Sequence, residues 1–542
     1  MRKKIIMICC AVAMLVQISG CARLDAMKSF VKSNIDQTIN QIKNLSATEA
    51  PAPESTVSAQ EAEVTNSLSL GVTDIDTWNP ILTQSEMVRE AMQLVYEPLF
   101  EINENMEAVP VLANDYSISP DGKTIEVNLK EGILWHDGSS FDAYDVEYTV
   151  NQLRLNSTVY SSMVSDISEC RAMGNNRVRF VLKRSIPDFV SLLTFPIIKY
   201  QTPMNVTLNY TPVGTGPYYY YGKTGTDEYM LYAFDSYHNG RAVVDSINIL
   251  KIPDVNKCYS MFEASEIDFI TSKMVDITTE MPRGNVKTYD YTSNRMTYLG
   301  FNLQSENLSG AATRIAVSNL INKEKLASTK LYSRVVPVDI PFNPSSYVYY
   351  DASPVLRDEY EKANEYLKKD NWEYDGKRYT RTVNGVSKTL TLKLLVNSDN
   401  YQKMQTANQI EEDLEKHGIE VTVEALSYNL YAARVEAHDF DMFIGETEIG
   451  ANQDLTPLTG YGNYFSYSNA DVDTIISHIG MTGDAEQKKQ LFIQLGTKLT
   501  EDMPFTPLYY AKESVICGAK LKTELNPTVS GFYRQANTWS VK

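Results

Sequence analysis

Residues 133–146 read ILWHDGSSFDAYDV, and this stretch predicts an ordered turn between a strand and a helix. Trp135 stands close to Asp137 and Gly138, a combination typical of a strand end followed by a tight turn. Asp145 lies inside the helix that follows, where its carboxylate can bond to the backbone around it. We therefore interpret these residues as scaffold rather than as ligand contacts.

The chain before and after this stretch carries short periodic patterns. Asp142 is the expected N-cap of a helix, and the turn with Pro120 and Gly122 predicts a hairpin. The first half is expected to hold strands over 67–72 and 177–182, the hairpin over 118–129, and helices over 87–99 and 142–153.

The second half alternates more regularly between the two kinds of element. We expect helices over 363–367 and 404–414, and strands over 390–395, 419–423 and 440–444. This order predicts an α/β lobe with a largely parallel sheet.

Length and composition indicate a large folded protein of several lobes. The chain has 542 residues, of which 43% are hydrophobic and 22% are charged, as in soluble globular proteins. Its net charge of -18 argues against a nucleic-acid partner, because phosphate recognition needs clustered Lys and Arg. The six cysteines show no spacing typical of a zinc site.

The N-terminus predicts export and a lipid anchor. Residues 1–20 begin with basic residues and continue with an apolar run over 5–16, the layout of a secretory signal. Residues 18–21 read ISGC, which resembles a bacterial lipobox, and the resemblance implies acylation of Cys21. Residues 24–45 then carry apolar residues at helical spacing, and residues 46–66 have the composition of a linker.

Residues 133–146 also resemble the signature of the family 5 solute-binding proteins, the peptide and nickel receptors of ABC importers. Weaker matches follow in the family's order along almost the whole chain after Leu68. They are 96–99, 214–218, 266–268, 301–302, 314–316, Ala363 with Leu367 and Trp372, and 418–421.

The resemblance implies a periplasmic-binding-protein-like fold of type II, cluster C. This α/β fold has two lobes around a hinged cleft and a smaller inserted α+β lobe. The expected boundaries are 1–20 for the signal peptide and 21–66 for the lipid-anchored stalk and linker. For the folded lobes the resemblance implies 67–100, 205–303 and 505–542 for lobe I, 101–204 for the inserted lobe II, and 304–504 for lobe III.

The resemblance also places the ligand between lobes I and III, against residues 73–79 and 445–454. The candidate contacts are Thr73, Asp74, Trp78, Asn79, Asn302, Glu446, Thr447, Glu448 and Asp454. Peptide receptors of the family hold the α-ammonium group with a carboxylate, often with a Trp and an Asp in the second loop. Residues 445–449 read GETEI and lack both, so Glu446 or Glu448 is the expected substitute.

No motif predicts catalysis, and we expect no enzyme activity, no metal-ligating residues and no cofactor. The histidines are scattered, and neither HExxH nor GxSxG occurs. We expect a monomeric lipoprotein on the extracytoplasmic face of the membrane. It is expected to bind a small solute, for which an oligopeptide is our first hypothesis, and to deliver this solute to ABC permease subunits. A nickel or metal-chelate receptor of the same family, and a sensor or adhesion lipoprotein without transport, remain alternatives.

Overall fold

The computed structural model describes residues 66–205, 210–272, 282, 284–350 and 359–541. The chain divides into two compact units, 1–63 and 64–542, and all described residues belong to the second. The predicted signal, Cys21, the helix over 24–45 and the linker up to residue 65 lie outside the described residues. Among the described residues, no helix is long and apolar enough to cross a bilayer.

The first sheet has the strand order β1-β10-β9-β8. The alternation that predicts a strand over 67–72 is confirmed, because Leu68, Leu70 and Val72 of β1 are buried. β1 pairs with β10 in parallel, and the other pairs are antiparallel. The elements are β1 (Ser67–Val72), α3 (Glu86–Met92), β8 (Tyr218–Lys223), β9 (Glu228–Ala233) and β10 (Ser246–Lys251).

Helix α3 is shorter than the predicted helix over 87–99. It ends at Met92, and the carbonyl groups of Leu94 and Val95 accept hydrogen bonds from the amides of Tyr218 and Gly216. The turn at 214–218 therefore takes the acceptors that a longer helix would have used.

The second sheet, with the order β4-β5-β7-β6, is antiparallel throughout and lies in the segment predicted as lobe II. The predicted hairpin is confirmed: β4 and β5 flank a turn in which Gly122 has a φ of +67°. The elements of this segment are β2 (Phe100–Ile102), β3 (Ala108–Pro110), β4 (Ala113–Ile118), β5 (Thr124–Leu129), α4 (Ala143–Leu155), α5 (Ser161–Val164), β6 (Ile167–Ala172), β7 (Arg177–Leu182) and the 3₁₀ turn η1 (Phe189–Leu192).

The segment 133–146 is scaffold, as its sequence predicts. Asp142 caps α4 by accepting from the amide of Tyr144 at 2.9 Å. Asp145 accepts from the Asp142 amide at 2.9 Å, from the indole Nε1 of the buried Trp135 at 3.1 Å and from the Tyr200 amide at 2.7 Å. Burial raises the pKa of Asp145, and these hydrogen bonds act against that rise.

The third sheet has seven strands in the order β11-β20-β12-β19-β17-β18, with β13 paired to β20. β17 pairs in parallel with β18 and β19, and the other pairs are antiparallel. The predicted largely parallel sheet is therefore wrong for the sheet as a whole, because two long strands from outside the β-α-β repeat join it. The strands are β11 (Phe269–Thr271), β12 (Val286–Phe301), β13 (Val335–Pro337), β17 (Thr391–Asn397), β18 (Glu420–Leu426), β19 (Met442–Glu448) and β20 (Phe505–Gly518).

Helices pack on both faces of this sheet. Met442 and Ile444 of β19 join a core with α7, α9 and α10, whereas Phe443 joins a core with α11, α13 and α14. The helices are α7 (Ala311–Leu320), α9 (Tyr360–Lys369), α10 (Tyr401–Lys416), α11 (Tyr428–Glu436), α13 (Ala470–Met481) and α14 (Ala485–Asp502). The remaining elements are η2 (Val255–Lys257), α6 (Cys258–Glu263), α8 (Lys323–Lys325), the π-helical turn η3 (Leu326–Lys330), β14 (Glu373–Tyr374), β15 (Tyr379–Val383), β16 (Val386–Thr389), α12 (Thr456–Thr459) and η4 (Tyr533–Thr538).

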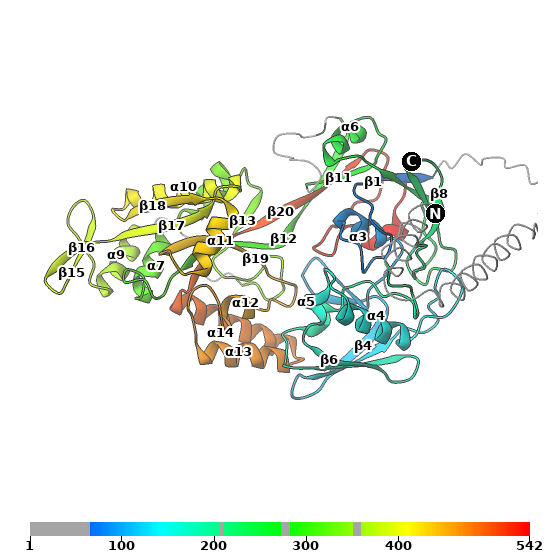
Figure 1. Cartoon of the computed structure of the whole chain (residues 1–542), viewed down its shortest axis with the longest axis horizontal. Helices are drawn as coiled ribbons and strands as arrows, with labels where there is room; N and C mark the ends of the chain where they lie inside the picture. Colours follow the sequence, from blue (N-terminus) through cyan, green and yellow to red (C-terminus); the bar gives the residue numbers. More distant parts are fainter. Residues whose placement is uncertain (1–65, 206–209, 273–281, 283, 351–358, 542) are drawn as a thin grey trace, which may run out of the picture. The chain divides into compact units, whose positions relative to one another are not determined.

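The long strands β12 and β20 run side by side (Figure 1). Their ladder extends from Val286 opposite Gly518 to Gly300 opposite Phe505, with a break in register between Thr292 and Met296. The sheet thus continues from the segment predicted as lobe III into segments predicted as lobe I. The exact lobe boundaries stay a prediction.

Gly214 illustrates how closely the turn at 214–218 approaches the chain after α3. A Cβ added at Gly214 would lie 1.8 Å from the carbonyl oxygen of Val95, far inside van der Waals contact. We therefore expect Gly214→Ala to lower the free energy of unfolding by about 1–3 kcal/mol or more, measured by urea denaturation.

Gly483→Ala is the control, because a Cβ added at Gly483 meets nothing within 4 Å. This variant should keep the wild-type stability to within about 0.5 kcal/mol. Equal stability of the two variants would contradict the proposed backbone contact.

Candidate binding site

The parallel strands of the third sheet define one edge at which functional side chains can gather. β17, β18 and β19 run in the same direction and end at Asn397, Leu426 and Glu448. In open α/β sheets, ligands bind outside the carboxyl ends of such strands. We call this the carboxyl edge, and the loops that begin there are 398–400, 427 and 449–455.

Two of the predicted contact residues place carboxylates at the carboxyl edge. Glu446 and Glu448 are exposed and lie on one face of β19, and Thr447, on the other face, is partly exposed. Lys403 Nζ lies 3.6 Å from Glu446 Oε1, and Arg295 of β12 pairs opposite Glu448. The structure therefore brings Glu446, Thr447 and Glu448 together, beside two cationic side chains.

Large exposed side chains with apolar surface also lie at the carboxyl edge, and they were not among the residues predicted from the sequence. Tyr401 begins α10 and is 62% exposed, while Tyr428 and Leu430 at the start of α11 are each 60% exposed. The Asp399 carboxylate accepts from the Tyr428 amide at 2.9 Å and so ties the two loops together. The signal that could have found these residues is a large apolar side chain in the first turn after a strand-to-helix loop.

The break in the β12–β20 ladder lies next to this edge. The amide of Ile449 donates to the carbonyl oxygen of Asn294 at 2.8 Å, which joins the loop after β19 to the break. Glu513 of β20 accepts from the hydroxyl of Tyr291 at 2.6 Å and from Arg295 at 3.0 Å. Burial and the nearby Glu513 carboxylate raise the pKa of Tyr291, so this phenol stays protonated and keeps donating.

The segment 73–79 offers fewer exposed side chains than its sequence predicts. Asp74 is exposed and has a φ of +48°, whereas Thr73 is buried against the Met87 sulfur at 3.3 Å. Trp78 is fully buried and packs on the rings of Tyr220 and Tyr229. The Trp78 side chain thus belongs to the core in this structure.

Two further polar residues of this segment bond to the chain around them. The buried Asn79 accepts from the Ile81 amide at 3.0 Å and donates to the Pro203 carbonyl at 3.3 Å. Burial acts to raise the pKa of Asp76, but hydrogen bonds from Thr83 and from backbone amides outweigh it and lower that pKa. Both side chains therefore hold the loop in shape.

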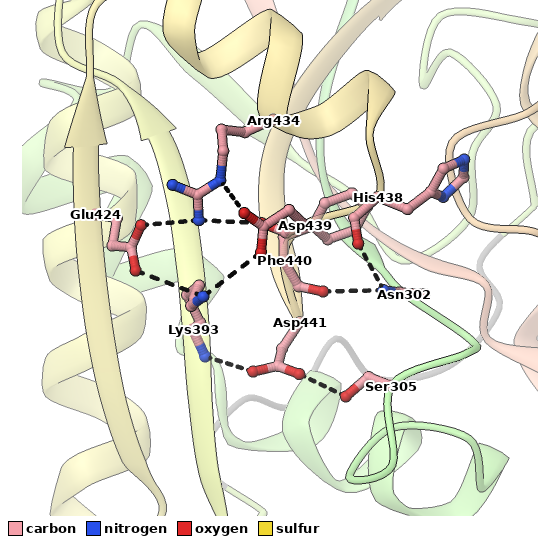
Figure 2. Close-up of polar contacts among 9 residues, drawn as sticks. All are labelled: Asn302, Ser305, Lys393, Glu424, Arg434, His438, Asp439, Phe440 and Asp441. Atoms are coloured by element: carbon pink, nitrogen blue, oxygen red, sulfur yellow. Dashed lines mark hydrogen bonds and ion pairs between the residues drawn. The ribbon is translucent and has the colours of Figure 1, made fainter.

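Asn302 lies at the opposite end of β19 from Glu448. Figure 2 shows its amide donating to the carbonyl oxygens of His438 at 3.1 Å and Phe440 at 3.0 Å, just before β19 begins. β19 has seven residues, about 20 Å of extended chain. The structure therefore does not bring Asn302 together with Glu446–Glu448.

The polar residues around Asn302 form a network that fixes the entry to β19 (Figure 2). Asp441 accepts from the Ser305 hydroxyl at 2.5 Å and from the Lys393 amide at 2.9 Å. Arg434 makes ion pairs with Glu424 at 3.1 Å and with Asp439 at 2.5 Å. These contacts account for the conformation of the turn between α11 and β19.

The Asp454 carboxylate is held by its own loop and by Arg184. One of its carboxylate oxygens accepts from the Thr456 amide at 2.9 Å, and the other lies 3.3 Å from Arg184. Arg184 belongs to the segment predicted as lobe II, so Asp454 links that segment to the loop after β19.

In the part of the chain that the structure describes, no three His, Cys, Asp or Glu side chains converge in a way that could hold a metal ion. Cys170, Cys258 and Cys517 are buried free thiols.

The sequence of this chain is similar to a known family of binding proteins and to several of its members. A model of the bacterial extracellular solute-binding proteins, family 5 (middle region), matches residues 107–471. The oligopeptide-binding protein AppA of Bacillus subtilis is 24% identical over 456 residues, 80% of this chain and 84% of AppA. The glutathione-binding protein GsiB of Escherichia coli K12 is 25% identical over 476 residues, 81% of this chain and 87% of GsiB.

Solved structures agree in fold. The unliganded open form of the murein tripeptide-binding protein MppA matches with a TM-score of 0.75 at 18% identity, over 88% of this chain and 97% of MppA. A nickel ABC transporter structure from Bacillus halodurans gives 0.74 at 20% identity, over 88% and 100%. These likenesses confirm the predicted type II binding-protein fold. The chain therefore belongs to the bacterial extracellular solute-binding proteins of family 5, which serve ABC importers as binding proteins and are not enzymes.

Proposed function

We propose that this solute-binding protein captures an oligopeptide at the carboxyl edge of the third sheet and delivers it to the permease of an ABC importer. The observation that carries the proposal is that the exposed carboxylates of Glu446 and Glu448 lie at the same edge of the sheet as the exposed side chains of Tyr401 and Tyr428. Glu446, Thr447, Glu448 and Asp74 are the proposed ligand contacts.

The chemistry of this edge suits a zwitterionic chain with varied side chains. A carboxylate can hold a peptide α-ammonium group by charge-assisted hydrogen bonds. Lys403 and Arg295, which pair with Glu446 and Glu513, are the cations near this edge that could balance a peptide carboxylate. Tyrosine rings provide flat apolar area with a polar tip and tolerate different side chains. The names of AppA and GsiB, which describe oligopeptide and glutathione binding, support the same ligand class.

Native mass spectrometry of the protein purified from its own host tests the proposal directly. We expect bound masses that form a ladder of short peptides, because such a site contacts the main chain rather than one side chain. A single mass that contains nickel, together with calorimetric binding of nickel chelates but not of mixed peptides, would replace the peptide assignment by a metal-chelate one.

The acidic pair gives a second prediction. Glu446→Gln combined with Glu448→Gln should weaken binding of a mixed peptide pool at least about ten-fold, because the loss of even one charged hydrogen bond costs about 1.5–3 kcal/mol. Calorimetry measures the change. The control, Glu373→Gln combined with Glu436→Gln, removes the same charge from exposed positions elsewhere in the segment predicted as lobe III, and it should bind normally.

We also propose that the protein is a monomeric lipoprotein anchored through Cys21, whose support is the ISGC sequence at 18–21. Cys21→Ser should abolish labelling of the protein by radioactive palmitate in growing cells and release it from the membrane fraction. Two or more acyl chains are needed for stable anchoring, so a variant that stays in the membrane fraction would contradict this proposal.

A further inference from the structure

A pocket of about 510 Å³ opens on the first sheet, away from the residues of the carboxyl edge. It is lined by residues of β8 and β9, by the segment 234–245 and by His136. The volume falls in the range of sites for small organic molecules, about 300–1,000 Å³. None of the contacts described above uses this pocket.

Aromatic rings form the floor of the pocket. Tyr219 and Tyr232 are opposite each other on β8 and β9 with ring centres 6.1 Å apart. The ring of Phe234 packs edge-on to His136 at 4.9 Å, and Tyr221, which is 64% exposed, packs on Tyr232 at 5.2 Å. The faces of such rings carry partial negative charge and attract cations.

His136 adds neither charge nor a spare hydrogen bond to this floor. Its Nδ1 accepts from the Gly214 amide at 3.2 Å, so its Nε2 carries the hydrogen and donates to the Gly216 carbonyl at 2.9 Å. Burial lowers the pKa of His136 to about 4, against weaker opposing effects of Gly216 and nearby acids. The imidazole is therefore neutral at pH 7.

The rim of the pocket has an excess of one negative charge. Arg241 Nε donates to Asp235 at 2.8 Å, and its NH2 donates to Asp245 at 2.9 Å. Its NH1 donates to the Ala242 carbonyl at 3.0 Å. Two carboxylates thus face one guanidinium group whose three nitrogens are already engaged, which disfavours an anionic ligand and favours a cationic one.

We propose that this pocket is a second ligand site, distinct from the carboxyl edge, and that it binds a small organic cation of the guanidinium or alkylammonium class. The apolar part of the ligand lies on the rings of Tyr219 and Tyr232, and its charge lies between these ring faces and the carboxylates of Asp235 and Asp245. The site does not depend on the identity of the solute at the carboxyl edge.

Ligand-observed NMR titration of the purified chain with butylguanidinium, and with its neutral isostere butylurea, tests the proposal. Butylguanidinium should bind about two- to five-fold more tightly, as expected for a cation over exposed aromatic rings. Tyr232→Leu should lose this preference, and Tyr232→Phe, which retains the ring, should keep it. Equal binding of the two probes, or unchanged binding by Tyr232→Leu, would overturn the proposal.

Charge variants locate the site without disturbing the core. The Asp235 side chain is 85% exposed, and Asp235→Asn should weaken butylguanidinium binding about two- to five-fold, as expected for the loss of an exposed ion pair. Asp227→Asn, an exposed position between the same two strands, should bind as the wild type does. The double variant Glu446→Gln with Glu448→Gln should also bind butylguanidinium as the wild type does. If that variant loses the cation while Asp235→Asn retains it, the cation occupies the carboxyl edge and the second site does not exist.

Discussion

The antiparallel ladder between β12 and β20 is the constraint on which the other parts depend. These two strands continue the third sheet past the end of β19 and reach β11, where Phe269 pairs with Cys517. Residue 268 then bonds to the first sheet, since the Asp268 amide donates to the Ser69 carbonyl. One ladder thus connects the elements around the first sheet with those of the third.

The position of the break in this ladder explains why charged groups gather there. Between Thr292 and Met296 the strands lose register. The irregular backbone there forms hydrogen bonds with other parts of the chain; for example, the side-chain Nδ2 of Asn343 donates to the Ser293 carbonyl oxygen at 2.8 Å. Glu513 stays buried in the ladder because Tyr291 and Arg295 donate to it. The polar groups of the break are thus satisfied within the protein, while Glu446 and Glu448 remain exposed, Glu446 beside Lys403.

Sequence reasoning succeeded where structure is decided locally. The cap at Asp142, the turn at Gly122 and the strand over 67–72 depend on neighbours within a few residues, and all are confirmed.

Sequence reasoning missed β12, because the polar residues 290–295 interrupt the alternation typical of a strand. Nothing nearby in the sequence reveals that Tyr220 and Tyr229 cover the ring of Trp78, so the sequence could not show that this candidate contact is buried in this structure. The acidic pair at 446 and 448 could be located from the sequence, whereas the pocket on the first sheet could not, because its walls come from four separate segments.

The sequence separation within the β12–β20 ladder has a consequence for folding. β20 begins at residue 505 of 542, and its partner strand begins at residue 286. A chain growing on the ribosome therefore lacks the partner strand of β11, β12 and β13 until synthesis is almost complete, and distant pairings of this kind form slowly. The third sheet can therefore be completed only after the strands of the first and second sheets, which all end by Lys251, have been synthesised.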